Sequence, residues 1–317
     1  MKNNTFKPNI AIAQINPIPG DINYNKNKIL DYIKKAQEKN IELVIFPQMS
    51  LYGHHKEDML EKFTFIFEQI KNALDEIREK TTITALVGYP IKEENEIYDS
   101  FALICNNEII ENVKVFDFLN TSFEIISKEE VENDNLNFEG ECLICPISSI
   151  SRTNKEYFRN KMFQKLVQNN KKKCLFVNQV GANDELVFDG TSRMYNENGE
   201  IIALAKNFEE DLLLIDLNYK NEIKKPYWFD KSTNLNEFNI DYDSDLERTY
   251  KALILSIKDY FSKNGFKQAV LGLSGGLDST ICAVLLADAL GEKNVLGISM
   301  PSKLTSDESK NDAKELA

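Results

Sequence analysis

The sequence has no apolar run long enough to cross a bilayer, no excess of basic residues and few cysteines. No stretch approaches the roughly 20 apolar residues of a transmembrane helix, and the apolar stretch 10–13 is too short for a signal peptide. A net charge of −12 argues against nucleic acid or an acidic membrane as partner. The five cysteines are odd in number and scattered, which is typical of reduced thiols. We therefore expect a cytoplasmic protein with no nucleic-acid or membrane partner.

Repeated cysteine and histidine pairs, the signature of a structural zinc site, are also missing. Cys142 and Cys145 form one CxxC, with neither a second pair nor histidines nearby. The cluster HHKED at 54–58 contains metal-ligating residue types, but adjacent residues on a loop rarely converge on one ion. We expect a buried apolar role for the two cysteines and no metal at 54–58.

The 317 residues, 42% of them hydrophobic, suffice for two domains. Short apolar strands alternate with helical patterns over the first two thirds, which is typical of an α/β sandwich. We expect strands at 10–15, 43–46, 83–88, 100–105, 142–149, 174–180, 192–195, 201–205 and 212–215, and helices at 27–39, 59–80 and from about Lys155. The predicted domains are 1–218 and 244–317, separated by a linker at 219–243 that loses periodicity.

A glycine-rich loop stands out near the carboxyl end of the chain. The residues SGGLDS, 274–279, lie between an apolar strand at 268–273 and an amphipathic helix that stops near Gly291. A second strand at 294–300 completes a βαβ unit. Such a loop offers backbone N–H groups and the positive end of a helix dipole to phosphate. It lacks both the Lys-Ser/Thr ending of a Walker A loop and the GxGxxG fingerprint, so it is a different kind of phosphate loop.

This loop resembles the SGGxDS loop of ATP pyrophosphatases, which cleave ATP to AMP and pyrophosphate. The stretch 300–307, with Asp312 and Ala313, is similar to the segment that follows the loop in NAD synthetases. The resemblance implies ATP and Mg²⁺ as cofactors, with Asp278 binding the Mg²⁺ that bridges to pyrophosphate. The ATP-binding residues that it implies are Gly272, Leu273, Ser274, Gly275, Gly276, Leu277, Asp278 and Ser279.

The segment VNQVGANDELVFDGTS, 177–192, closely resembles the nitrilase-like glutaminase domain of glutamine-dependent NAD synthetases. The stretches 13–17 and 46–47 agree, so that the resemblance covers nearly the whole chain. It implies an α/β fold, namely a nitrilase-like αββα sandwich followed by the start of a doubly wound parallel-sheet ATP-pyrophosphatase domain of the adenine nucleotide alpha hydrolase type. It further implies that the protein is a homo-oligomer and that deamido-NAD, ATP and ammonia or glutamine are its partners.

Nitrilase chemistry needs a glutamate as general base, a lysine that stabilises the tetrahedral intermediate and a cysteine nucleophile. The position of the glutamate is Gln48, whose amide cannot take up the thiol proton. The lysine aligns with Lys114, and an ordinary solvated lysine is the alternative. The strand and helix that carry the nucleophile are expected to be deleted, which leaves Cys145 as a poor substitute. Ser149 and Lys155 fit the family's Ser-Pro-x-x-x-Gly-Lys stretch, which implies glutamine binding if that function is retained.

Three interpretations remain. The chain is an NAD synthetase that adenylates deamido-NAD and amidates it with ammonia, a glutamine-hydrolysing synthetase with an atypical amidase site, or a non-catalytic nitrilase-like scaffold that assembles oligomers. The family's phosphate-loop domain continues beyond the position of Ala317. We therefore expect a fragment or a natural truncation, whose own activity is open.

Overall fold

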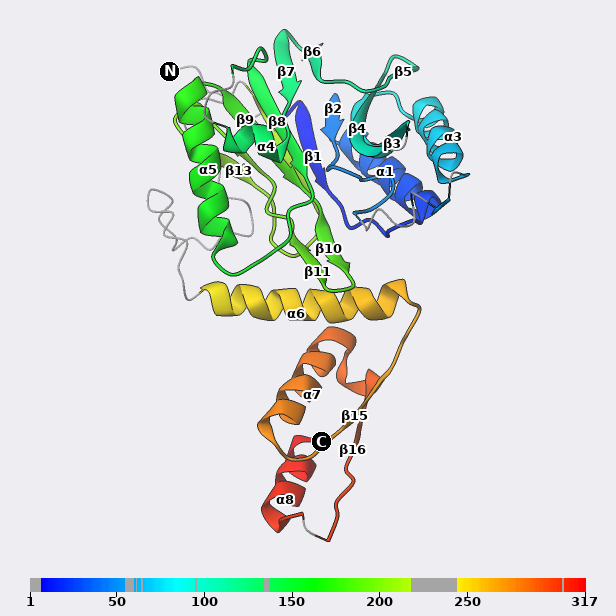
Figure 1. Cartoon of the computed structure of the whole chain (residues 1–317), viewed down its shortest axis with the longest axis vertical. Helices are drawn as coiled ribbons and strands as arrows, with labels where there is room; N and C mark the ends of the chain where they lie inside the picture. Colours follow the sequence, from blue (N-terminus) through cyan, green and yellow to red (C-terminus); the bar gives the residue numbers. More distant parts are fainter. Residues whose placement is uncertain are drawn as a thin grey trace. The chain divides into compact units, whose positions relative to one another are not determined.

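The computed structural model describes two compact units (Figure 1). The first is drawn from residues 1–181 and 188–242, the second from 182–187 and 243–317. The described residues are 7–54, 60, 62–63, 65–94, 96–133, 137–217, 244–303 and 305–317. Among them, no helix has both the length and the apolar character needed to span a membrane. The predicted linker at 219–243 lies outside the described residues, so the predicted domain boundaries stay predictions.

The first six-stranded sheet of unit 1 has the order β14-β1-β2-β3-β4-β5. Strands β1, β2 and β3 are parallel, and the outer strands β14, β4 and β5 pair antiparallel. The bounds are β1 (Ile10–Gln14), β2 (Leu43–Ile45), β3 (Thr84–Glu93), β4 (Glu96–Cys105), β5 (Glu108–Ile110) and β14 (Asp211–Ile215), with helices α1 (Ile22–Gln37) and α3 (Phe65–Lys80). Both faces of β1 are covered, which explains why the strand is apolar throughout except for Gln14.

The second six-stranded sheet has the order β13-β12-β9-β8-β7-β6. Its centre, β7, β8 and β9, is parallel. The bounds are β6 (Val115–Phe118), β7 (Thr121–Ile125), β8 (Cys142–Ile147), β9 (Lys173–Asn178), β12 (Arg193–Tyr195) and β13 (Ile201–Leu204), with helices α4 (Lys128–Glu132) and α5 (Lys155–Asn170). A two-stranded hairpin of β10 (Val180–Asn183) and β11 (Leu186–Asp189) follows β9.

Three apolar cores show that unit 1 has four layers. One core joins the first sheet to α1 and α3 and contains Ala11 and Ile29. The second lies between the sheets, where Ile10 and Ile12 of β1 meet residues such as Ile144 of β8. The third joins the other face of the second sheet to α4 and α5. Figure 1 shows α1 and α3 on one outer side of the paired sheets and α5 on the other. The expected αββα sandwich is confirmed.

The boundaries differ from the predicted ones where local capping decides them. Helix α1 begins at Ile22 rather than at residue 27, because the Asp21 side chain accepts a hydrogen bond from the Tyr24 N–H and caps the first turn. The elements β6, β7 and α4 lie in a segment for which the sequence pattern predicted no structure. Residues 55–59, part of them within the predicted helix at 59–80, lie outside the described part of the chain.

Unit 2 contains the predicted βαβ arrangement. Strands β15 and β16 are parallel, with Ala269 opposite Val295 and Gly272 opposite Ile298. The bounds are α6 (Ser244–Lys263), β15 (Ala269–Gly272), α7 (Leu277–Leu290), a short 3-10 turn (Glu292–Asn294), β16 (Val295–Ile298) and α8 (Asp307–Leu316). The segment 182–187 also belongs to this unit.

Candidate functional site

The glycine-rich loop of unit 2 connects β15 to α7 as predicted. Gly275 has a φ of +81°, and a Cβ at this position would lie 2.1 Å from the Ser309 carbonyl oxygen, so only glycine fits. The loop is closed by its own serines: the Gly276 N–H donates to Ser274 Oγ at 3.1 Å, and Ser279 Oγ donates to the Gly276 carbonyl at 2.9 Å. These contacts within the loop hold its shape.

The start of α7 is open to an anion. No side chain of the described residues caps this helix at Gly276, so the N–H groups of its first turn remain available. At the base of the loop, the Leu273 N–H donates to the Ile298 carbonyl at 2.9 Å and Leu273 is buried, which anchors the loop to β16. Gly272 pairs with Ile298 in the sheet, and Leu277 is exposed at the first turn of α7.

Asp278 supplies a single exposed carboxylate in the first turn of α7. Within the described part of the chain, no group of three or more His, Cys, Asp or Glu side chains could hold a metal ion. Mg²⁺ in nucleotide sites takes one or two carboxylates, and substrate phosphates and water complete its coordination. One carboxylate beside a phosphate loop therefore fits a Mg²⁺ that arrives with its nucleotide, and Asp278 is the residue that would hold it.

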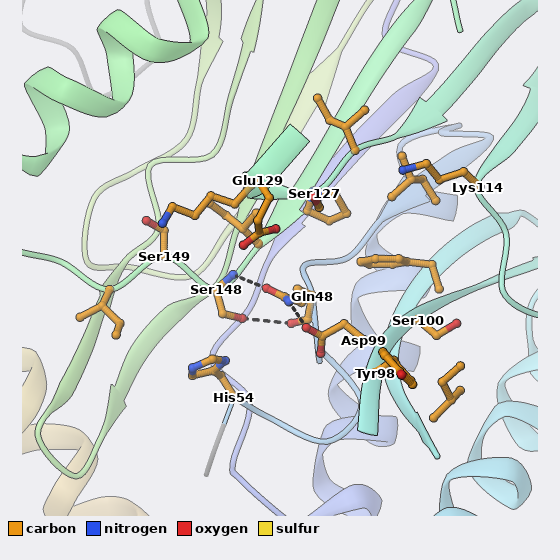
Figure 2. Close-up of a pocket in the computed structure, with 18 of the residues that line it drawn as sticks. Gln48, His54, Tyr98, Asp99, Ser100, Lys114, Ser127, Glu129, Ser148 and Ser149 are labelled. Atoms are coloured by element: carbon orange, nitrogen blue, oxygen red, sulfur yellow. Dashed lines mark hydrogen bonds between the residues drawn. The ribbon is translucent and has the colours of Figure 1, made fainter. Parts of the chain in front are cut away.

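Unit 1 contains a second candidate site, a cavity of about 990 Å³ with mixed polar and apolar walls (Figure 2). It lies where several strands end. Gln48 follows β2, Lys114 precedes β6, Ser127 follows β7, and Ser149 follows β8. Lys155, at the start of α5, completes the polar wall. The structure thus brings four of the predicted glutaminase residues, Gln48, Lys114, Ser149 and Lys155, into one pocket.

The amide of Gln48 is held on both sides. Its Nε2 donates to Asp99 Oδ2, and its Oε1 accepts from the Ser148 N–H at 2.9 Å. Ser148 Oγ also donates to the Gln48 carbonyl at 3.3 Å. Figure 2 shows Gln48 between Asp99 and Ser148. Both ends of the side chain are occupied by complementary groups, so the amide is built into the wall and offers no proton acceptor comparable with a carboxylate.

Lys114 is paired with a carboxylate from the same unit. Its Nζ lies 2.8 Å from both Oε1 and Oε2 of Glu130. Ser127 in turn caps α4: its Oγ accepts from the Glu130 N–H at 3.2 Å, and Glu130 Oε2 accepts from the Ser127 N–H at 2.7 Å. This is a capping box. Lys114 thus lines the pocket with its side chain 53% exposed and paired, and its assignment as the glutaminase lysine stays a prediction.

The expected deletion between Lys114 and Ser149 is wrong at the level of the fold. Strand β7 runs parallel to β8, with Phe123 opposite Cys142, and α4 connects the two strands. A strand and a helix therefore stand ahead of the Ser149 strand, although α4 has only five residues. The chain turns from β7 into α4 at Ser127, which lines the pocket.

Cys145 lies outside the pocket. It is fully buried on the face of β8 that packs beneath α5, in the same core as Phe163. Burial raises the pKa of the Cys145 thiol far above its usual range, and the negative charges of Glu129 and Glu130 raise it further. These contacts fit a buried apolar cysteine and do not fit a nucleophile. Cys142 is also buried, on the face between the sheets, where burial raises its pKa to about 12.

Ser149 and Lys155 form the opposite wall. The Ser149 N–H donates to Asn178 Oδ1 at 2.8 Å, and Asn178 Nδ2 donates back to the Ser149 carbonyl at 3.3 Å. Lys155 Nζ donates to the Ile150 carbonyl at 2.5 Å. Burial, and to a smaller extent the positive charge of Arg159, lower the pKa of Lys155 to about 8. Hydrogen bonds with Asn178 therefore hold this wall in place, and Lys155 supplies its positive charge.

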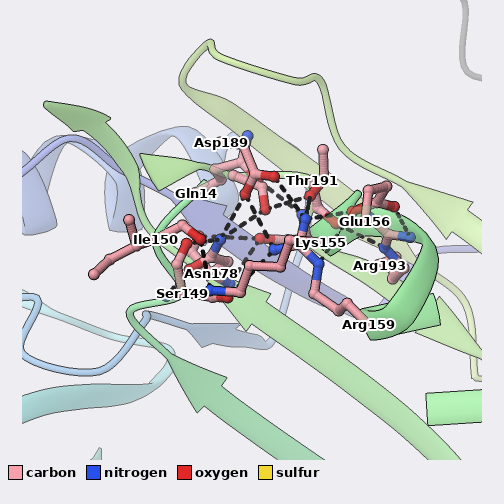
Figure 3. Close-up of polar contacts among 12 residues, drawn as sticks. Gln14, Ser149, Ile150, Lys155, Glu156, Arg159, Asn178, Asp189, Thr191 and Arg193 are labelled. Atoms are coloured by element: carbon pink, nitrogen blue, oxygen red, sulfur yellow. Dashed lines mark hydrogen bonds and ion pairs between the residues drawn. The ribbon is translucent and has the colours of Figure 1, made fainter. Parts of the chain in front are cut away.

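A buried ion-pair network supports this wall (Figure 3). Arg159 donates to Asp189 Oδ1 at 3.1 Å and to Asp189 Oδ2 at 2.6 Å, and Asn178 Nδ2 donates to Asp189 Oδ1 at 3.2 Å. Arg193 Nη1 lies 2.5 Å from Glu156 Oε1. Burial works against the charge of Arg159, but Asp189 and Glu156 raise its pKa overall. Charges buried this deeply are tolerated only when they are paired and hydrogen-bonded.

The sequence pattern missed Ser127, Glu130 and the buried network. The signal for the first two was present, since Ser127-x-x-Glu130 has the spacing of a capping box. The network has no such signal, because Arg159, Asn178 and Asp189 lie on three separate elements. Of the HHKED cluster, His54 lines the pocket, and residues 55–58 lie outside the described part.

A segment of each unit matches a known protein family. Residues 9–115 match the carbon-nitrogen hydrolase family and residues 249–317 match the NAD synthase family. The glutamine-dependent NAD(+) synthetase of Aquifex aeolicus (strain VF5) is 33% identical over 98% of this chain and 63% of that protein. That of Thermotoga maritima is 29% identical over 97% of this chain and 63% of that protein.

A solved structure agrees with the sequence relatives. The glutamine-dependent NAD+ synthetase from Acinetobacter baumannii, in complex with ADP, superposes with a TM-score of 0.79 and 25% identity, covering 96% of this chain and 62% of that one. The chain thus spans 62–63% of the length of these relatives. A carbon-nitrogen hydrolase match is followed here by an NAD synthase match, and nearly the whole chain is similar to these glutamine-dependent NAD(+) synthetases.

Proposed function

We propose that this protein serves ATP-dependent NAD synthesis with ammonia, rather than glutamine, as its nitrogen source. The carboxylate of deamido-NAD is adenylated by ATP with release of pyrophosphate, and ammonia then displaces AMP to give the amide. Adenylation is needed because a carboxylate is a poor acyl electrophile. The observation that carries the nitrogen assignment is the Gln48 amide, held between Asp99 and Ser148 where the family has its general base.

The phosphate loop supports the ATP half of the proposal. The open first turn of α7 and the turn at Gly275 offer N–H groups to phosphate oxygens. Ser274 and Ser279 place hydroxyl groups beside them. Asp278 would hold Mg²⁺, which supplies charge neutralisation for the pyrophosphate when bound.

The pocket of unit 1 supports the loss of glutamine hydrolysis. We assign Ser127, which follows β7 and lines the pocket, to the place of the family's nucleophile. A hydroxyl is a far weaker nucleophile than a thiolate unless a base activates it. Gln48 cannot be that base. Ser149 and Lys155 still line the pocket, so we assign them to holding an amino-acid ligand without hydrolysing it.

The test is NAD formation from deamido-NAD and ATP, with ammonium or glutamine, by this chain and by any longer product of its gene. We expect NAD with ammonium, little with glutamine, and loss of activity in Asp278→Asn. NAD formed from glutamine as readily as from ammonium would overturn the nitrogen assignment and favour a glutamine-hydrolysing synthetase with an atypical amidase site. No NAD with either would favour the non-catalytic scaffold.

A further inference from the structure

We propose that Glu130 keeps the Lys114 end of the unit 1 pocket electrically neutral, and so makes the pocket prefer an uncharged amide there over a carboxylate. The inference rests on the proposed role of Ser149 and Lys155 in holding a ligand. Glu130 then determines specificity, because its carboxylate already lies beside the Lys114 ammonium group.

The contact is a two-point ion pair. Lys114 Nζ lies 2.8 Å from each carboxylate oxygen of Glu130, and the two side chains are 53% and 29% exposed. Burial of Glu130 opposes its charge, but the hydrogen bonds from Lys114 and Ser127 lower the pKa of the carboxyl overall. Glu130 is therefore ionised at neutral pH and cancels the charge of Lys114.

Both partners are also held through the main chain. The Ile125 N–H of β7 donates to the Lys114 carbonyl at 2.8 Å, which fixes Lys114 beside the strand that leads into α4. The capping box between Ser127 and Glu130 fixes the carboxylate at the other end of the same connection. The ion pair thus joins two anchored segments and does not depend on two free side chains meeting.

The other end of the pocket differs in charge. Lys155 Nζ donates to the Ile150 carbonyl, and it forms no salt bridge with a carboxylate of the described residues, although Asp189 attracts it through space. Lys155 thus has no ion-pair partner among the described residues, whereas Lys114 is paired with Glu130.

Of the charged residues beside Ser127 in the lining, Lys128 is paired with Glu132, and Glu129 adds a further negative charge. A ligand with one carboxylate and an uncharged far end matches this distribution better than a ligand with two carboxylates.

The test compares L-glutamine with L-glutamate, which differ only at the far end, by calorimetric titration of the whole chain. Glu130→Gln removes the charge and keeps a side chain that can still complete the capping box. We expect the glutamate-to-glutamine affinity ratio to rise roughly two- to fivefold, the range of a partly exposed ion pair. Glu247→Gln is the matched control, because Glu247 pairs with Lys251 on α6 and neither residue lines the pocket, so it should leave the ratio unchanged.

An unchanged ratio in Glu130→Gln overturns the proposal, and so does the absence of binding by both amino acids in both forms. A second measurement separates the failures. Reductive methylation of Lys114, followed by mass spectrometry, should be about two- to fivefold faster in Glu130→Gln than in the unmodified chain. Faster methylation without any amino-acid binding means that the proposed ligand role of Ser149 and Lys155 has failed while the ion pair stands. Equal methylation rates overturn the ion pair itself.

Discussion

The buried pair between Arg159 and Asp189 gives the sharpest prediction for stability. The side chains are 3% and 2% exposed, and Asp189 also accepts from Asn178, which holds the wall at Ser149. The change Asp189→Ala removes the carboxylate and leaves the Arg159 guanidinium buried with only Glu156 to compensate its charge. The cost is dominated by this uncompensated charge, because water cannot reach the guanidinium to replace the lost partner.

Breaking such a buried pair costs about 3–5 kcal/mol of unfolding free energy. With a denaturant slope of roughly 3 kcal/mol per molar urea, the midpoint should fall by about 1 M or more. The assay is equilibrium urea unfolding of the whole chain, followed by circular dichroism.

The matched control is Glu132→Ala, which breaks the ion pair with Lys128, both of whose side chains are more than half exposed. Exposed pairs of this kind contribute about 0–1 kcal/mol, so the control should barely move the midpoint. Equal, small shifts for Asp189→Ala and Glu132→Ala would refute the argument that the network stabilises unit 1.

Three further predictions concern single residues. Gly275→Ala should weaken ATP affinity at least tenfold in a binding titration, because the left-handed backbone alone costs about 1–2 kcal/mol and the new Cβ would meet the Ser309 carbonyl oxygen; unchanged affinity would contradict the loop assignment. Burial lowers the pKa of Lys155 to about 8, so the unfolded chain binds this proton more tightly, and unfolding free energy should rise between about pH 8 and the ordinary lysine pKa of about 10.5. Lys155→Met should remove that rise, and its persistence would count against the burial. Iodoacetamide should label the exposed Cys282 first and reach the buried Cys145 only on unfolding; early labelling of Cys145, detected by mass spectrometry, would contradict its place in the core.

Much of the fold followed from the sequence, because both sheets have apolar parallel strands at their centres. The runs at β1, β2, β8 and β9 are buried on both faces, and such runs need little context to be recognised. The phosphate loop was equally predictable, since a tight turn with φ of +81° at Gly275 demands glycine locally.

The second candidate site could be predicted only in part. Gln48 and Lys155 were found because they lie within recognisable stretches. Ser127 was missed because β7 is only half apolar, with Glu124 turned toward the main-chain N–H groups of residues 139 and 140. Glu124 is buried despite its charge, since these N–H groups satisfy it. Periodicity cannot register a carboxylate that tertiary contacts bury, and so the strand that ends at Ser127 left no clear pattern.

The central claim is that the pocket of unit 1 no longer hydrolyses amides. The most direct measurement is the release of glutamate from L-glutamine by this chain, followed over time between pH 6 and 9. The proposed assignment puts an amide, Gln48, in the place of the carboxylate base and a hydroxyl, Ser127, in the place of the thiol, which predicts no release above the spontaneous rate at any pH. Steady release that saturates with glutamine concentration, and that disappears in Ser127→Ala, would contradict the account.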